Sequence, residues 1–74
     1  MFGNKITKII SIEGMHCEHC SKRVEEALKS VKGVKNVKVN IEAKNAEVIL
    51  KEDIENHILK SVIEDIGFEV TDVQ

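Results

Sequence analysis

The spacing of apolar residues alternates between a period of two and a period of about 3.6, and this alternation restricts the fold more than any other feature. A glycine stands at three of the changes, at Gly14, Gly33 and Gly67. Because the chain contains no proline, these glycines supply the strong breaks between elements. The sequence therefore predicts a short series of strands and helices with clear boundaries.

The first half of the chain predicts a strand and then a helix. From Lys5 to Ile12 the apolar residues share one parity apart from Ile9, which indicates a mostly buried strand. From about His19 to Lys32 the spacing becomes that of an amphipathic helix. Its apolar positions are Val24, Ala27, Leu28 and Val31. Gly33 is the expected stop of this helix.

Two further strands follow, joined by a short polar turn at Ala43–Asn45. The apolar residues that alternate with polar ones are Val37, Val39 and Ile41 before the turn, and Ala46, Val48 and Leu50 after it. Two strands joined so closely form an antiparallel hairpin.

The last third predicts a second helix and a short final strand. The helix runs from about Ile54 to Ile66, with Asp53 as the expected N-cap and Gly67 as the stop. Its apolar stripe consists of Ile54, Ile58, Val62 and Ile66, broadened by Leu59 and Ile63. Phe68 and Val70 mark the final strand.

The resulting order βαββαβ is the ferredoxin-like arrangement, an α+β sandwich in which two helices cover one face of a four-stranded antiparallel sheet. A chain of 74 residues buries only about 60% of the surface that its unfolded form exposes, so it supports one core. We expect a single domain over residues 1–74.

Composition excludes several classes of function. A net charge of −2 with mixed signs argues against nucleic acid as a partner, and only Phe2 and Phe68 are aromatic, so no platform for stacking bases exists. No apolar run is long enough for a signal peptide or a transmembrane helix. We therefore expect a cytoplasmic protein that does not insert into membranes, in a reducing compartment where a disulfide scaffold is disfavoured.

Both cysteines lie in the stretch "GMHCEHC", between the first strand and the first helix. A helix N-terminus stabilises thiolates, Cys20 most strongly, and Lys22 and Arg23 add positive potential. With two residues between them, Cys17 and Cys20 can direct both sulfurs at one soft ion such as Cu(I).

Two other chemistries of this cysteine pair stay open. Structural zinc takes four ligands, but no cysteine follows Cys20 and His57 is the only later histidine. His16 and His19 can complete a four-ligand set, although adjacent ligands at His16 and Cys17 are geometrically awkward. Dithiol redox chemistry also uses CxxC at a helix start. Thioredoxin-like proteins carry a proline opposite that site, and this chain has none.

Placed between a strand and an amphipathic helix, "GMHCEHC" resembles the GMxCxxC signature of the heavy-metal-associated domain family. That family includes small copper chaperones and the N-terminal metal-binding modules of copper-transporting P-type ATPases. The resemblance extends over the whole chain and includes "VKGVKNVKVN" and "IEDIGFEV". It implies a ferredoxin-like fold and Cu(I) held by Cys17 and Cys20. It also implies transfer by ligand exchange and no enzymatic activity.

The resemblance also assigns roles to neighbouring residues. Met15 matches the apolar anchor beneath the loop, and Phe68 is expected near the metal. His16 departs from the pattern, because Thr or Ser is common at this position in copper-binding members, and its imidazole is expected near the metal or near a dimer contact. Phe68 stands where ATPase modules often carry Phe, whereas a chain that starts at Met1 and stops after the last strand is expected of a free-standing chaperone.

The partners implied by the resemblance are a copper-transporting P-type ATPase and a copper-responsive regulator. The metal-free chain is expected to be a monomer, with a copper-bridged homodimer as a further form. The alternatives are an ATPase regulatory domain, a carrier of Hg, Ag or Zn, and a dithiol oxidoreductase.

Overall fold

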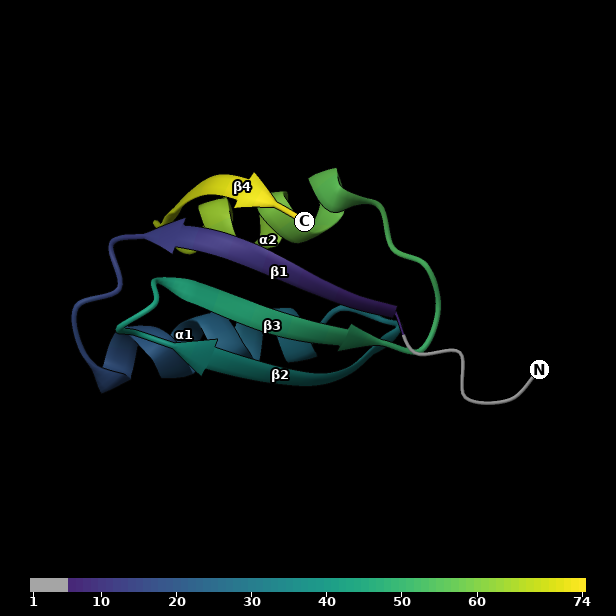
Figure 1. Ribbon diagram of the computed structural model, residues 1–74, viewed down its shortest axis with the longest axis horizontal. Helices are drawn as coiled ribbons and strands as arrows, with labels where there is room; N and C mark the ends of the chain where they lie inside the picture. The colour runs from purple at the N-terminus through teal and green to yellow at the C-terminus, as the bar shows by residue number, and fades with distance from the viewer. Residues whose placement is uncertain (1–5) are drawn as a thin grey trace.

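The structure, a computed structural model, describes residues 6–74 and contains six elements in the predicted βαββαβ order (Figure 1). Their bounds are β1 Ile6–Glu13, α1 Glu18–Lys29, β2 Val34–Asn40, β3 Asn45–Leu50, α2 Asn56–Asp65 and β4 Glu69–Val73. Lys5, where the first strand was expected to start, lies outside the described residues. Neither helix within residues 6–74 has the length and apolar character needed to span a membrane.

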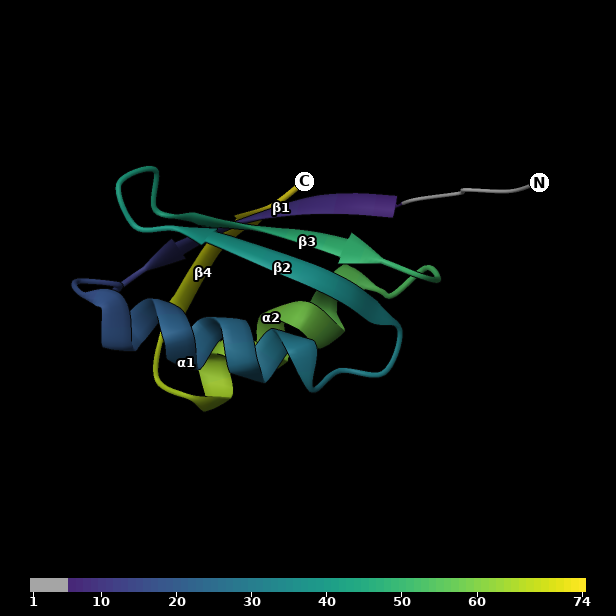
Figure 2. The same ribbon diagram turned by 90° about the horizontal axis from the view of Figure 1, so that it is seen from below.

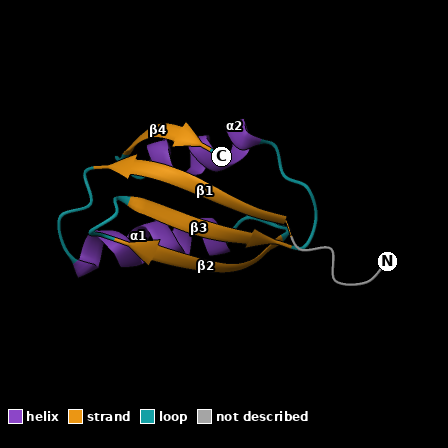
Figure 3. Cartoon of the chain, in the orientation of Figure 1, coloured by secondary structure: helices purple, strands orange, loops and turns teal. Residues whose placement is uncertain are grey.

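The four strands form one sheet in the order β2-β3-β1-β4, and every neighbouring pair is antiparallel. Both helices lie on the same side of this sheet (Figure 2). Figure 3 shows how the loops join strands and helices at the two ends of the sandwich. The predicted ferredoxin-like α+β fold is therefore confirmed.

The core lies between the sheet and the two helices, where alternate strand residues meet the buried helix positions. Its fully buried large side chains are Ile10, Ile12, Leu28, Leu50, Leu59, Ile63, Val24 and Val48. No polar or charged side chain among residues 6–74 is buried with them. Hydrophobic burial on this one face is thus what fixes the strand register, because a slip by one residue would turn each apolar side chain to solvent.

Helix α2 begins later than predicted. Its N-cap is Glu55, so the prediction of Asp53 as the N-cap is wrong. Ile54 turns into the core with only 6% of its surface exposed, and this holds the backbone extended until Glu55. The buried stripe is accordingly centred on Leu59 and Ile63, while Ile58, expected on the stripe, is 39% exposed.

Helix α1 ends earlier than predicted, at Lys29, with Ser30 as its C-cap. The N–H of Ser30 donates to the carbonyl of Glu26 at 3.1 Å, which closes the last turn. Gly33 is therefore not the residue that stops the helix. With a φ of 101°, it instead forms the turn into β2, which starts at Val34.

Candidate metal centre

The loop that carries the paired cysteines joins β1 to α1 at one end of the sandwich (Figure 1). Gly14 has a φ of 103°, which favours glycine. A Cβ atom at Gly14 would lie 3.3 Å from Cδ1 of Phe68, so the ring of Phe68 packs directly over the glycine. Strand β4 follows Phe68, and the sequence-predicted residue Phe68 is thereby brought to the base of the loop.

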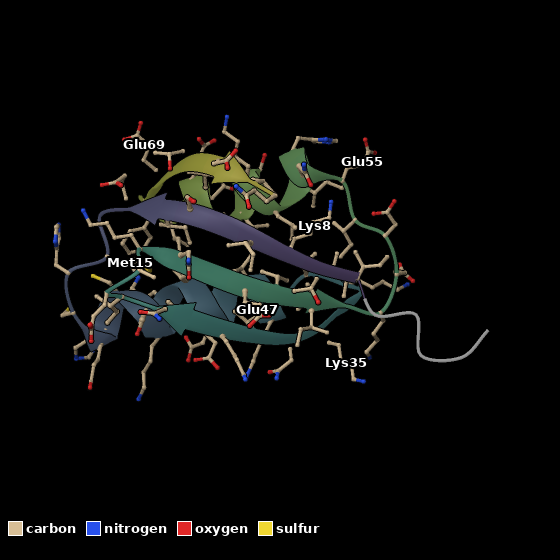
Figure 4. The ribbon with its side chains drawn as sticks, in the orientation of Figure 1. Lys8, Met15, Lys35, Glu47, Glu55 and Glu69 are labelled. Carbon is tan, nitrogen blue, oxygen red and sulfur yellow. The ribbon has the colours of Figure 1, made fainter. Side chains whose placement is uncertain are left out.

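Met15 packs into the core and thereby anchors the loop. Its side chain is only 6% exposed and belongs to the main hydrophobic cluster. Figure 4 shows Met15 beside the loop, with Glu69 of β4 at the same end of the molecule. The chain direction is therefore fixed immediately before the two cysteines.

Cys17 and Cys20 occupy different positions relative to α1. Cys17 is the N-cap, with an extended backbone and an exposed side chain, whereas Cys20 lies in the first turn and packs half-buried against the core. Both are free thiols, and their Sγ atoms lie 3.7 Å apart. A disulfide needs about 2.0 Å, whereas two metal–sulfur bonds of about 2.3 Å each span 3.7 Å with a bend at the metal.

The start of α1 favours negative charge on Cys20. No side chain caps the helix, so its first amides are free to face the sulfurs. A hydrogen bond from the backbone of His16 lowers the pKa of the Cys20 thiol, and hydrogen bonds from Cys17 and the charge of Arg23 lower it further, against partial desolvation that raises it. The predicted lowering of the Cys20 pKa is thus present and Arg23 contributes, but the backbone groups responsible are those of His16 and Cys17, just before the helix, and Lys22 does not contribute.

The histidines are not gathered into a ligand set with the sulfurs. His16 and His19 are both exposed, and His57 lies on α2, where its Nδ1 is 3.8 Å from a carboxylate oxygen of Glu55. Within the described part of the chain, no three His, Cys, Asp or Glu side chains are grouped so as to hold one ion. The structure therefore brings together the two sulfurs and leaves the three histidine side chains exposed.

One contact near the loop was not predicted from the sequence. Nη2 of Arg23 on α1 donates to the carbonyl oxygen of Ile66, the C-cap residue of α2, at 3.4 Å. The two residues are 43 positions apart, so periodicity gives no signal for the pair. The only sequence indication was the position of Arg23 three residues after Cys20.

Fold and loop together define a ferredoxin-like module with a CxxC pair at the start of its first helix. The chain belongs to the heavy-metal-associated domain family, whose model matches residues 9–69. It is 40% identical to the copper chaperone CopZ of Staphylococcus saprophyticus, over 86% of this chain and 96% of the relative.

Solved structures agree with this assignment. A CopZ metallochaperone aligns with a TM-score of 0.84 and 34% identity, covering 89% of this chain and all of its own length. A copper-binding domain from HMA7, a P-type ATPase, aligns with a TM-score of 0.80 and 32% identity, covering 93% and 99% of the two chains. Free-standing chaperones and ATPase modules therefore share this fold.

Proposed function

We propose that this protein is a copper metallochaperone that carries Cu(I) on Cys17 and Cys20 in the cytoplasm and delivers it to a copper-transporting P-type ATPase. The observation that carries the proposal is the pair of free sulfurs 3.7 Å apart at the start of α1. Support also comes from the similarity to a protein named copper chaperone CopZ over 96% of that relative's length.

The donor set suits a soft monovalent ion. Two thiolates without further nearby donors prefer Cu(I) over hard ions. A linear S–metal–S arrangement with bonds of about 2.3 Å needs sulfurs about 4.6 Å apart. Rotation of the exposed Cys17 side chain supplies the difference from 3.7 Å, while Cys20 stays packed against the core.

The same asymmetry suggests the course of metal transfer. An incoming thiolate reaches the ion from the side of Cys17, because that side chain is exposed at the tip of the loop. It adds to the two-coordinate ion, one resident sulfur leaves, and the ion passes to the partner without entering solvent. Met15 and Phe68 supply the apolar base that limits water beneath the loop. No bond of a substrate other than metal–sulfur bonds is made or broken, so the protein acts without catalysis.

A second candidate is a regulatory metal-binding module of a copper ATPase. The observation in its favour is the 32% identity to the copper-binding domain of HMA7 over nearly the whole of both chains. A downstream membrane region in the same gene would decide for this candidate. The carrier role for Hg, Ag or Zn, the dithiol oxidoreductase, the copper-responsive regulator as partner and the copper-bridged homodimer stay as predictions.

The test is a competition titration of the reduced protein with Cu(I) and Zn(II) against chelators of known affinity. Wild type is expected to bind one Cu(I) tightly. The Cys17→Ser/Cys20→Ser variant is expected to lose far more than the roughly 10- to 100-fold that changing an outer-shell partner costs. His16→Ala is expected to retain the wild-type affinity for Cu(I). Tight Cu(I) binding by the double serine variant would refute the site, and reduction of insulin by wild type would favour the oxidoreductase.

A further inference from the structure

Arg23 links the cysteine-bearing helix to the opposite helix. It follows Cys20 by three residues, so the two side chains lie on the same side of α1, with Cβ atoms about 5–6 Å apart. Its Nη2 donates to the carbonyl oxygen of Ile66 at 3.4 Å, two residues before Phe68, whose ring packs over Gly14 of the loop. The guanidinium is therefore tethered beside the site instead of moving freely in solvent.

The partner that holds Arg23 is neutral. A carbonyl at a helix C-terminus carries only a partial negative charge, so it orients a cation without cancelling it. The ion pairs recorded within residues 6–74 join Lys29 to Glu25 and His57 to Glu55, and neither involves Arg23. Arg23 thus keeps its full positive charge close to Cys20.

A fixed positive charge distinguishes between ions of different valence. Two thiolates and one monovalent ion form a complex of charge −1, whereas two thiolates and one divalent ion form a neutral complex. A nearby cation stabilises the first and has no net charge to act on in the second. Both ions bind the same metal-free protein. The ratio of the Cu(I) affinity to the Zn(II) affinity therefore depends only on the charge difference between the two complexes, and not on the number of protons on the metal-free thiols.

We infer that Arg23 contributes to the specificity of the site: its charge, oriented by the Ile66 carbonyl one helical turn from Cys20, favours a monovalent over a divalent ion between Cys17 and Cys20. This inference rests on the proposed function. It assigns to a residue outside the CxxC pair a role in excluding Zn(II), which is chemically the competing cargo for two thiolates.

The test compares the Cu(I) to Zn(II) affinity ratio in Arg23→Gln and Arg23→Glu with that of wild type at low ionic strength. Because interactions between exposed charges are weak, the ratio of the Cu(I) affinity to the Zn(II) affinity should fall by about 1.5- to 5-fold in Arg23→Gln. Charge reversal changes the charge by two units, so Arg23→Glu predicts the square of that factor, about 2- to 25-fold. Arg23→Lys keeps the charge and is expected to restore most of the ratio. High salt should shrink all of these differences.

Lys22→Gln and Lys22→Glu are the matched controls, because they make the same change in net charge one residue away and on another side of the helix. Their effect on the ratio is expected to be clearly smaller. A second measurement uses the metal-free variants. Amide chemical shifts and hydrogen exchange at Ile66, Gly67 and Phe68 should change in Arg23→Gln and stay as in wild type in Lys22→Gln.

The outcomes separate this inference from the proposed function. If wild type binds no Cu(I), the proposed function fails. If wild type binds Cu(I) and the Arg23 and Lys22 variants shift the ratio equally, or not at all, the role of Arg23 is overturned while the proposed function stands. A selective fall for Arg23 with recovery in Arg23→Lys supports the inference.

Discussion

The N-termini of α1 and α2 have the same backbone arrangement and lie at opposite ends of the molecule (Figures 1 and 4). In each, the N-cap residue is extended and no side chain caps the free amides. A buried anchor precedes each one, Met15 before α1 and Ile54 before α2, and each anchor is 6% exposed.

The two ends differ in the side chains that meet those amides. At α1 two thiols lie 3.7 Å apart, and one of them has a lowered pKa. At α2 the N-cap is a carboxylate, and the ammonium of Lys8 donates to the side-chain oxygen of Asn56. Free helix amides are therefore common to both ends and do not define a site. The α1 end is distinguished by its two thiols, which the anchored loop holds close enough to bind one metal ion together.

Removal of the anchors is expected to give the largest effects. Met15→Ala and Ile54→Ala should each lower the free energy of unfolding by about 2–5 kcal/mol, since both truncate a buried side chain. Only Met15→Ala should also weaken Cu(I) binding, by about 10-fold or more, because it supports the ligand loop. Urea unfolding and chelator competition measure the two quantities.

Met15→Leu keeps the volume and should cost less than about 1.5 kcal/mol, so it provides a folded control if Met15→Ala unfolds. An equal loss of Cu(I) affinity in Met15→Ala and Ile54→Ala would mean that stability, and not support of the loop, governs binding.

Better N-cap residues are expected to raise the free energy of unfolding, by less than removal of the anchors lowers it. Serine is a better N-cap than either native residue, because its hydroxyl accepts a hydrogen bond from a free amide of the first turn. Cys17→Ser and Glu55→Ser should therefore each raise the free energy of unfolding of the metal-free protein by about 0.5–1 kcal/mol.

Cys17→Ser should gain this stability and lose Cu(I) binding, whereas Glu55→Ser should gain it and bind as wild type does. Paired denaturation and competition measurements on both variants test this. A destabilised Cys17→Ser variant would show that the thiol contributes to the fold.

The smallest expected effect is on pH dependence. A thiol whose pKa is lowered by folding gives up its proton more readily in the folded state, so the unfolded chain binds more protons between that lowered pKa and the ordinary value of about 8.5. The free energy of unfolding of the metal-free protein should rise with pH across this window and lose the increment as pH falls through the folded pKa of Cys20.

Denaturation at a series of pH values in wild type and Cys20→Ser measures this increment, which should be missing from the variant. The difference in thiolate absorbance between wild type and Cys20→Ser, followed against pH, reports the pKa of Cys20 with Cys17 in place. Identical pH slopes in wild type and Cys20→Ser would contradict a lowered pKa.

Much of the fold was predictable because its elements differ in period and glycines mark several of their ends. The residue at which α2 starts was harder to predict from the sequence. By residue type Asp53 is the expected cap, yet the helix starts after Glu55, because the burial of Ile54, a tertiary contact, keeps the backbone extended there.

The site was predictable in its residues and less in its geometry. The CxxC spacing identifies Cys17 and Cys20 as neighbours on one helix start, but it does not give the 3.7 Å between the sulfurs or the greater burial of Cys20. The contact between Arg23 and Ile66 depends on how the two helices pack, so no local sequence pattern predicts it.

The direction of β1 has a consequence for how such a module can be attached to other things. The strand runs from Ile6 at the far end of the sandwich to Glu13 beside the loop, and its eight residues span about 26 Å (Figure 1). The start of β1 therefore lies at the pole opposite the sulfurs. Immobilisation through that end should leave the cysteine loop free to meet a partner.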